Sequence, residues 1–199
     1  MTIDLSQFPA DLRDRLIAAG SGPEPPFDPV MREFLENQRR ELEQRAARGG
    51  LLDFAVMGRD APWLYRLRFA TKGLVRDAKG EIGTVESHVI AVRFLPDYLR
   101  RANRFEMLAL IEPHFPPAFH PNIHPSGGIC VEIYPAEPIV EIAQSLHDLL
   151  RWRLRQYDER DALNPDACAY GRQHIERPID DRPLFGRRME LTLESPKET

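Results

Sequence analysis

Apolar residues recur along this chain with two different periods, one typical of helices and one typical of strands. Over residues 29–48 the apolar positions fall at helical spacing, and Asp28 followed by Pro29 is a favourable pair for beginning a helix. The glycines at positions 49 and 50 end the pattern. We therefore predict a helix over 29–48, whose apolar positions include Val30, Phe34, Leu35 and Leu42.

Four segments with the pattern of strands follow this helix, and turn-forming residues separate them. In the second segment apolar residues alternate with Arg66 and Arg68, which is typical of a sheet with one face in water. Residues 77–80, Asp-Ala-Lys-Gly, predict a hairpin turn. Strands that follow one another without helices between them favour an antiparallel meander. The four segments are LLDFAVM (51–57), WLYRLRFA (63–70), SHVIAVRFL (87–95) and RFEMLALI (104–111).

The second half of the chain is predicted to contain a long loop and two helices. Prolines are too closely spaced for helix or sheet over residues 113–130. From Pro138 an apolar stripe continues at helical spacing as far as Leu154. The Asn-Pro pair at 164–165 then predicts a shorter helix through Ala169. With helices before and after the strands, the predicted fold class is α+β.

The chain divides into one domain with an appendage at each end. Its 199 residues, of which 42% are hydrophobic, suffice for one sizeable core. Residues 1–26 combine a short helical pattern with a proline-rich linker, and residues 27–175 contain all the elements described above. Residues 176–199 are polar and charged, and we expect a tail in which MELTL, residues 189–193, is a short strand.

Charge and hydropathy exclude several classes of partner. The net charge of -4 and the isoelectric point near 5.9 give no basic surface for nucleic acid. The apolar runs are far shorter than the roughly 20 residues that cross a bilayer, and the chain begins with a polar segment rather than a secretory signal. We therefore expect a cytoplasmic protein that binds neither nucleic acid nor membranes.

The cysteine and lysine contents indicate the redox environment of the protein and the type of organism that encodes it. Only two cysteines, Cys130 and Cys168, are present, which are too few for a disulfide-stapled secreted module, so we expect reduced thiols. The basic residues are almost all arginine, with lysine only at positions 72, 79 and 197. This bias indicates a GC-rich, bacterial coding sequence and leaves few lysines for self-modification.

The candidate chemistry lies in residues 120–130, whose sequence is HPNIHPSGGIC. A thiolate is a strong nucleophile, so Cys130 can accept an acyl group from an activated thioester without a base of its own. The amide of Asn122 can donate a hydrogen bond to the oxyanion that forms when an amine attacks such a thioester, or it can instead fix the loop through an Asx-type bond. We expect His120 to hold the loop rather than to transfer protons.

Three other interpretations of Cys130 are open. A buried structural cysteine is common for this residue type. A Cys-His hydrolase would need His147 or His174 as its base, and His147 is expected to be a partly buried helix residue. A zinc site would use imidazole and thiolate ligands, but the spacing of the candidate ligands fits no standard zinc pattern, and we expect no metal. Those candidate ligands are His114, His120, His124 and Cys130.

The segment HPNIHPSGGIC resembles the active-site segment of ubiquitin-conjugating enzymes, in its His-Pro-Asn, its short glycine-containing loop and its Ile-Cys pair. The similarity extends over residues 27–174, because the predicted order of helix, four-strand meander, active-site loop, helix and short helix is the order of that family. The resemblance implies that Cys130 carries a ubiquitin-like protein as a thioester and that Asn122 assists its transfer to an amine on an acceptor protein. It also implies an activating enzyme as partner and no cofactor.

Other stretches match that family unevenly. Residues 94–98, FLPDY, are similar to its Phe-Pro-x-Asp-Tyr with one insertion, and residues 131–133, VEI, are similar to its Leu-Asp-Ile. The Pro-Phe continuation with its proline pair and the Trp-Ser-Pro-Ala segment, with which conventional members bind RING-type ligases, are absent, which argues against such a ligase. Residues 164–167, NPDA, resemble the Asn-Pro-x-Asp turn beside the acceptor site. The aspartate position of that turn holds Ala167, so Asp166 would be its substitute. Asp166 and Tyr134 would either flank the acceptor or be solvated surface residues.

These departures indicate a divergent, bacterial member, similar to the enzymes of bacterial ubiquitin-like conjugation operons that act in antiphage defence. The expected function is a ubiquitin-conjugating-type transferase. A second hypothesis is a non-catalytic module of the same fold that binds a ubiquitin-like protein or scaffolds a complex. The cysteine at the motif position argues against the second hypothesis.

Overall fold

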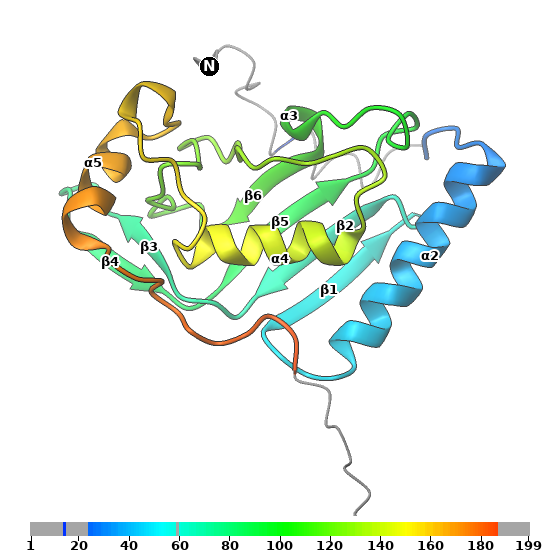
Figure 1. The fold of residues 1–199 in the computed structure, drawn as a ribbon, viewed down its shortest axis with the longest axis horizontal. Helices are drawn as coiled ribbons and strands as arrows, with labels where there is room; N and C mark the ends of the chain where they lie inside the picture. Colours follow the sequence, from blue (N-terminus) through cyan, green and yellow to red (C-terminus); the bar gives the residue numbers. More distant parts are fainter. Residues whose placement is uncertain (1–13, 15–23, 59, 187–199) are drawn as a thin grey trace, which may run out of the picture.

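The computed structural model describes residues 14, 24–58 and 60–186, which build a four-stranded antiparallel sheet with helices against one face (Figure 1). Most of the predicted N-terminal appendage, and the strand predicted at 189–193, lie outside the described residues. No helix in the described ranges is long and apolar enough to cross a membrane. In chain order the elements are α2 (Pro29–Ala46), β1 (Leu52–Met57), β2 (Leu64–Phe69), β3 (Gly73–Arg76), β4 (Ile82–Val85), β5 (His88–Arg93), α3 (Arg104–Met107), β6 (Leu108–Glu112), α4 (Ile139–Leu150), the 3-10 turn η2 (Glu159–Asp161) and α5 (Pro165–His174).

The sheet is a meander. Its strands pair in the order β1-β2-β5-β6, each antiparallel to its neighbour. Between β2 and β5 the chain forms a separate two-stranded hairpin of β3 and β4, closed by the predicted turn at 77–80. The predicted α+β class, with a helix before and helices after a four-stranded antiparallel meander, is confirmed.

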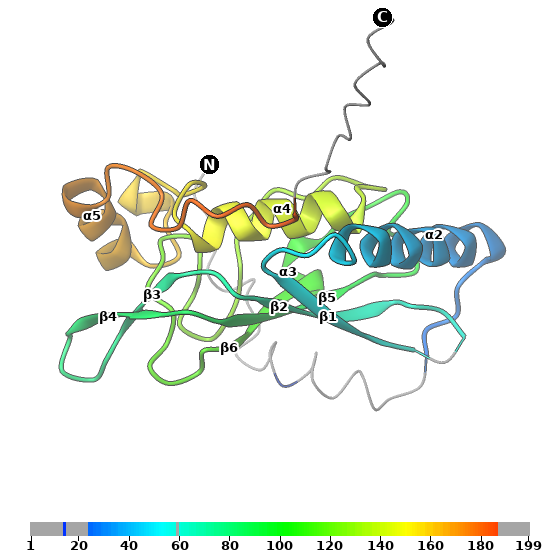
Figure 2. The ribbon, with the colours of Figure 1, turned by 90° about the horizontal axis from the view of Figure 1, so that it is seen from below.

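The alternation of apolar residues and arginines along β2 determines which face of the sheet packs against the helices. Tyr65, Leu67 and Phe69 are buried on one face, and Arg66 and Arg68 are exposed on the other. Figure 2 shows α2 and α4 on the same side of the sheet, so the hydrophobic core lies between these helices and the strands. The arginines of β2 therefore face away from the core, as the sequence pattern predicts.

The helix α2 begins where its capping residues predict. The Asp28 carboxylate accepts a hydrogen bond from the backbone N–H of Met31 at 2.8 Å, which satisfies one of the free donors of the first turn. Val30, one of the predicted apolar positions, is 66% exposed, and Met31 is buried in its place. Gln38 accepts a hydrogen bond from the backbone N–H of Ile139 at 2.8 Å and so joins α2 to the start of α4.

The predicted first residue of the fourth strand is wrong. Residues 104–107 form the short helix α3 because Asn103 caps it: its side chain accepts from the N–H of Phe105 and donates to Glu106 at 2.8 Å. The strand β6 consequently begins at Leu108. Capping chemistry has here overridden the apolar pattern of the segment.

Two helix ends also differ from the predictions. α4 ends at Leu150, and Leu154, which was assigned to its apolar stripe, is 37% exposed. The chain leaves the helix at Trp152, whose φ of +67° is incompatible with helical continuation. α5 reaches His174 rather than Ala169.

Residues 178–186, which the sequence places in a polar tail, pack against the domain. The N–H of Ile179 donates to the carbonyl of Arg151 at 2.9 Å, and the carbonyl of Leu184 accepts from the N–H of Leu51 at 2.8 Å. The Leu184 side chain is buried. This segment runs from α5 past the end of α4 to the start of β1 (Figure 1), so it links elements far apart in the sequence.

Candidate functional site

Backbone pairing brings the two ends of the candidate motif together. The N–H of Cys130 donates to the carbonyl of Asn122 at 2.8 Å, and Ile123 and Ile129 form an isolated antiparallel bridge. Gly127, with a φ of +96°, allows the chain to reverse between them. Asn122 and Cys130, which are 8 positions apart in the sequence, are therefore neighbours in the fold. The number of residues between Asn122 and Cys130 in the motif is therefore the length of this irregular hairpin.

The carboxamide of Asn122 is held at both ends by backbone groups. Its Nδ2 donates to the carbonyl of Cys130 at 3.0 Å, and its Oδ1 accepts from the N–H of Gln156 at 2.7 Å. Because a backbone N–H must meet an oxygen, the contact with Gln156 determines which end of the amide faces the cysteine. A primary amide has two N–H donors, and in the described residues only one is used, by Cys130.

His120 supports this loop from the core. Its Nδ1 accepts a hydrogen bond from the N–H of Asn122 at 3.1 Å, and its side chain is 2% exposed. Burial, helped by the nearby Arg155 and His88, lowers the pKa of His120 to about 3. The ring is therefore neutral at physiological pH, with its proton on Nε2. It is suited to holding the loop rather than to exchanging protons with a substrate.

The thiol of Cys130 is half-buried at the end of the hairpin. Burial raises its pKa, and the positive charge of Arg104 in α3 partly offsets this. Cysteines activated for hydrolysis instead have a pKa of roughly 3.5–7.5. Cys130 is therefore mostly a protonated thiol at neutral pH, which suits exchange with an acyl group that is already activated.

The bases and metal ligands considered from the sequence are not assembled around Cys130. His147 is buried in α4, where burial lowers its pKa to about 4, and the Nδ1 of His174 lies 3.0 Å from the carbonyl oxygen of Tyr170. Neither imidazole is hydrogen-bonded to Cys130 within the described residues, as a general base for this thiol would need to be. In the same part of the chain, no three His, Cys, Asp or Glu side chains gather closely enough to hold a metal ion.

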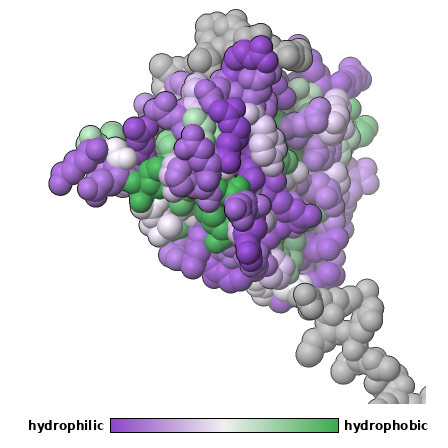
Figure 3. Space-filling view, turned by 60° about the vertical axis from the view of Figure 1, so that its left-hand side comes forward, coloured by the Kyte–Doolittle hydropathy of each residue, from purple (hydrophilic) through white to green (hydrophobic). Residues whose placement is uncertain are grey.

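The two residues expected beside the acceptor occupy separate places. The Asp166 carboxylate lies at the start of α5, 2.8 Å from the guanidinium of Arg76. Tyr134 is 59% exposed in the loop that follows Cys130. Among the described residues no hydrogen bond or ion pair connects either one to Cys130 or Asn122, and their role beside an acceptor stays a prediction. Figure 3 shows the α5 end of the molecule as largely hydrophilic, with a few hydrophobic side chains in its middle.

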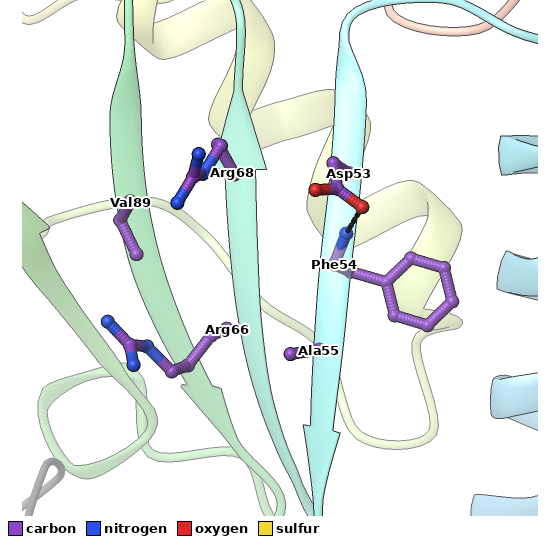
Figure 4. A pocket seen from close by; sticks show the side chains of 6 residues that line it. All are labelled: Asp53, Phe54, Ala55, Arg66, Arg68 and Val89. Carbon is purple, nitrogen blue, oxygen red and sulfur yellow. Dashed lines mark hydrogen bonds between the residues drawn. The ribbon is translucent and has the colours of Figure 1, made fainter.

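A shallow hollow on the face of the sheet opposite α2 and α4 is a second candidate site. Figure 4 shows the guanidinium groups of Arg66 and Arg68 on the Val89 side of β2, while the carboxylate of Asp53 accepts from the N–H of Phe54 at 2.8 Å. Within the described residues neither guanidinium forms an ion pair. Among the described residues that line it there is no cysteine, serine or histidine, and it lies on the face of the sheet that α4 does not cover. The hollow therefore offers no group that could carry an acyl group.

Sequence reasoning missed two contributors to the cysteine site. Gln156 acts through its backbone N–H, a group that every residue except proline has, so no motif marks it. Arg104 was hidden because residues 104–107 were assigned to a strand rather than to the short helix α3. Both become visible only when the chain is folded.

The protonated state of Cys130 predicts a particular pH dependence of alkylation. In a Cys168→Ser background we expect the iodoacetamide reaction rate to rise with pH through a midpoint above the usual thiol pKa of about 8.5. Arg104→Gln should move the midpoint higher, because it removes the positive charge that favours the thiolate. Arg101→Gln is the control, since Arg101 pairs with Asp97 at 3.5 Å. A midpoint below the usual value, or no response to Arg104→Gln, would contradict this description of the thiol.

The sequence similarity of this chain to known proteins is low. No protein-family model matches the chain, and no curated protein matches it. Among solved structures it is similar to the ubiquitin conjugating enzyme E2 UbcA1 from Agrocybe aegerita, with a TM-score of 0.41 and 14% sequence identity over 60% of this chain and 80% of that one. At this level of similarity, the residues of this chain must support any functional conclusion themselves.

Proposed function

We propose that this protein is a ubiquitin-conjugating-type transferase, in which Cys130 carries a ubiquitin-like protein as a thioester. The observation that supports this best is the clamped carboxamide of Asn122. One Nδ2 proton is bound by the carbonyl of Cys130, and the other is available beside the residue that would bear the thioester. The sequence resemblance of residues 120–130 to the active-site segment of that family supports the same reaction.

The first step is thiol exchange with an activating enzyme. The sulfur of Cys130 attacks the carbonyl carbon of the activating enzyme's thioester, a new carbon–sulfur bond forms, and the bond to the activating enzyme's sulfur breaks. The proton lost by Cys130 is taken up by the departing thiolate, directly or through solvent. Because one thioester replaces another, the step needs no strong base. Partial burial of Cys130 limits attack by water on the loaded thioester.

The second step transfers the acyl group to an amine. Attack of a neutral amine on the thioester carbonyl places negative charge on the carbonyl oxygen, and an N–H from Asn122 stabilises that oxyanion. The carbon–sulfur bond then breaks, the Cys130 thiolate leaves, and the amine's surplus proton passes to that thiolate or to solvent. The product is an amide between the ubiquitin-like protein and the acceptor.

The proposed partners and the proposed cellular setting rest on the sequence alone. The partners are a ubiquitin-like protein, an activating enzyme and an acceptor protein, and the absent ligase-binding segments argue against a conventional RING-type ligase. Tyr134 and Asp166 would flank the acceptor. The proposed setting is the bacterial cytoplasm, in a conjugation pathway that acts against phage, and the arginine-rich composition and the divergent motifs support this part of the proposal.

Thioester formation is the direct test of the proposal. The protein is incubated with ATP and with the ubiquitin-like protein and activating enzyme of its genomic neighbourhood, and the products are separated with and without reductant. We expect an adduct that reductant removes, that is lost in Cys130→Ala, and that becomes reductant-resistant in Cys130→Ser, because the latter forms an ester. Cys168→Ser, the matched control, should load normally. If no cognate pairing gives an adduct, the non-catalytic binding module is favoured, and ATP-independent cleavage of a conjugate would instead favour the hydrolase.

Asn122 should matter for discharge and not for loading. We expect Asn122→Ala to load at the normal rate and to discharge to amines roughly 10²–10³-fold more slowly, the usual effect of losing one oxyanion donor. Single-turnover discharge from the isolated thioester measures this directly. The matched control is Asn37→Ala on the exposed side of α2, where Asn37 accepts from the guanidinium of Arg40 at 2.6 Å, and it should leave discharge unchanged. Equal losses in loading and discharge for Asn122→Ala would mean that Asn122 only supports the fold.

A further inference from the structure

Trp152, at the end of α4, has a backbone conformation that large residues rarely adopt. Its φ is +67°, in the left-handed region, and its side chain is fully buried. For a residue with a Cβ this conformation is unfavourable, and it persists only where the surroundings impose it. Glycine, which has no such cost, would be the usual residue at this position.

The surroundings of the indole explain why the conformation is held. The ring of His120 lies against it at 4.8 Å between centroids, with an angle of 65° between the ring planes. On another side is Gly171 of α5, where an added Cβ would lie only 2.4 Å from Cζ3 of Trp152. The indole therefore fills a space between the loop that carries the site and the last helix.

The turn at Trp152 determines where residues 153–158, the return loop, lie. Arg155 of this loop donates to the carbonyl of Trp152 and to the carbonyl of Ile175, each at 2.8 Å. The next residue, Gln156, donates its N–H to Asn122. The chain thus leaves α4, reverses at the indole and meets the clamped amide four residues later in sequence, with Arg155 fastening the loop between the two points.

We infer that Trp152 is a positioning residue for the transfer step: wedged between His120 and Gly171, it fixes the return loop so that the N–H of Gln156 orients the Asn122 carboxamide toward Cys130. The expected effect of Trp152 on the transfer rate rests on the function proposed above. Its expected effect on the hydrogen bond between Gln156 and Asn122 does not, and the two effects can be measured separately.

Gly171→Ala tests the inference without removing the buried indole. Inside a helix, replacing glycine with alanine normally stabilises the protein, so a harmful effect points to the contact with Trp152. We expect unchanged loading and discharge slowed by roughly tenfold to a hundredfold, the scale of loss when a catalytic group is misplaced by about 1 Å. Gly83→Ala is the matched control, because its Cβ would meet only Val75 Cγ2, at 3.8 Å. Trp152→Phe added to Gly171→Ala should restore discharge, since the smaller ring leaves room for the methyl group.

Two further measurements separate positioning from a general packing defect. In an Asn122→Ala background, Gly171→Ala should slow discharge no further, because the group it misplaces is already gone. Slowing of the same size in both backgrounds would overturn the inference. Independently of any transfer reaction, hydrogen exchange of the Gln156 amide should be faster in Gly171→Ala and unchanged in Gly83→Ala. If that exchange responds but no thioester ever forms, the positioning stands and the proposed function fails; if thioester transfer occurs and Gly171→Ala alters neither discharge nor exchange, the inference fails.

Discussion

The candidate site depends on two hydrogen bonds to one side chain, which hold the carboxamide of Asn122 between the N–H of Gln156 and the carbonyl of Cys130. Both partners are backbone groups, so the orientation of the amide is set by the path of the chain and not by the rotamer of another side chain. The hairpin of residues 122–130, the end of α4 and the return loop consequently act as one unit. A shift in any of them moves the amide relative to the thiol.

The chemistry of this unit suits the proposed role of a thioester carrier. Burial raises the pKa of Cys130, and the buried His120 is neutral and hydrogen-bonded to the loop, so among the described residues no general base is hydrogen-bonded to the thiol. Such a site is slow to attack an ordinary amide but can exchange with an activated thioester. In the proposed reaction the Asn122 donor would contribute only when charge develops on the carbonyl oxygen, which would favour the transfer step over the ground state.

Local chemistry made part of this structure predictable from sequence. The capping pair at 28–29, the alternation of arginines along β2 and the Asn-Pro pair at 164–165 each act within a few residues, and each predicted its element. The helix α3 was missed because the apolar run of residues 105–111 was given more weight than the capping pair of Asn103 and Glu106. The packing of residues 178–186 was missed because backbone hydrogen bonds leave no trace in an apolar pattern. The hydrogen bond between Gln156 and Asn122 joins residues 34 positions apart through a backbone N–H, which no sequence motif marks. The left-handed turn at Trp152 was also not predictable, because no glycine occupies that position.

The most direct test of the account is the hydrogen bond that orients Asn122. A trans-hydrogen-bond NMR coupling between the amide nitrogen of Gln156 and Cγ of Asn122 reports that bond in solution, without requiring a substrate or partner. The account predicts a measurable coupling, together with two distinct Nδ2 protons on Asn122, of which the one bonded to the Cys130 carbonyl exchanges more slowly with solvent. Absence of the coupling, with a Gln156 amide that exchanges as fast as an exposed loop, would contradict it.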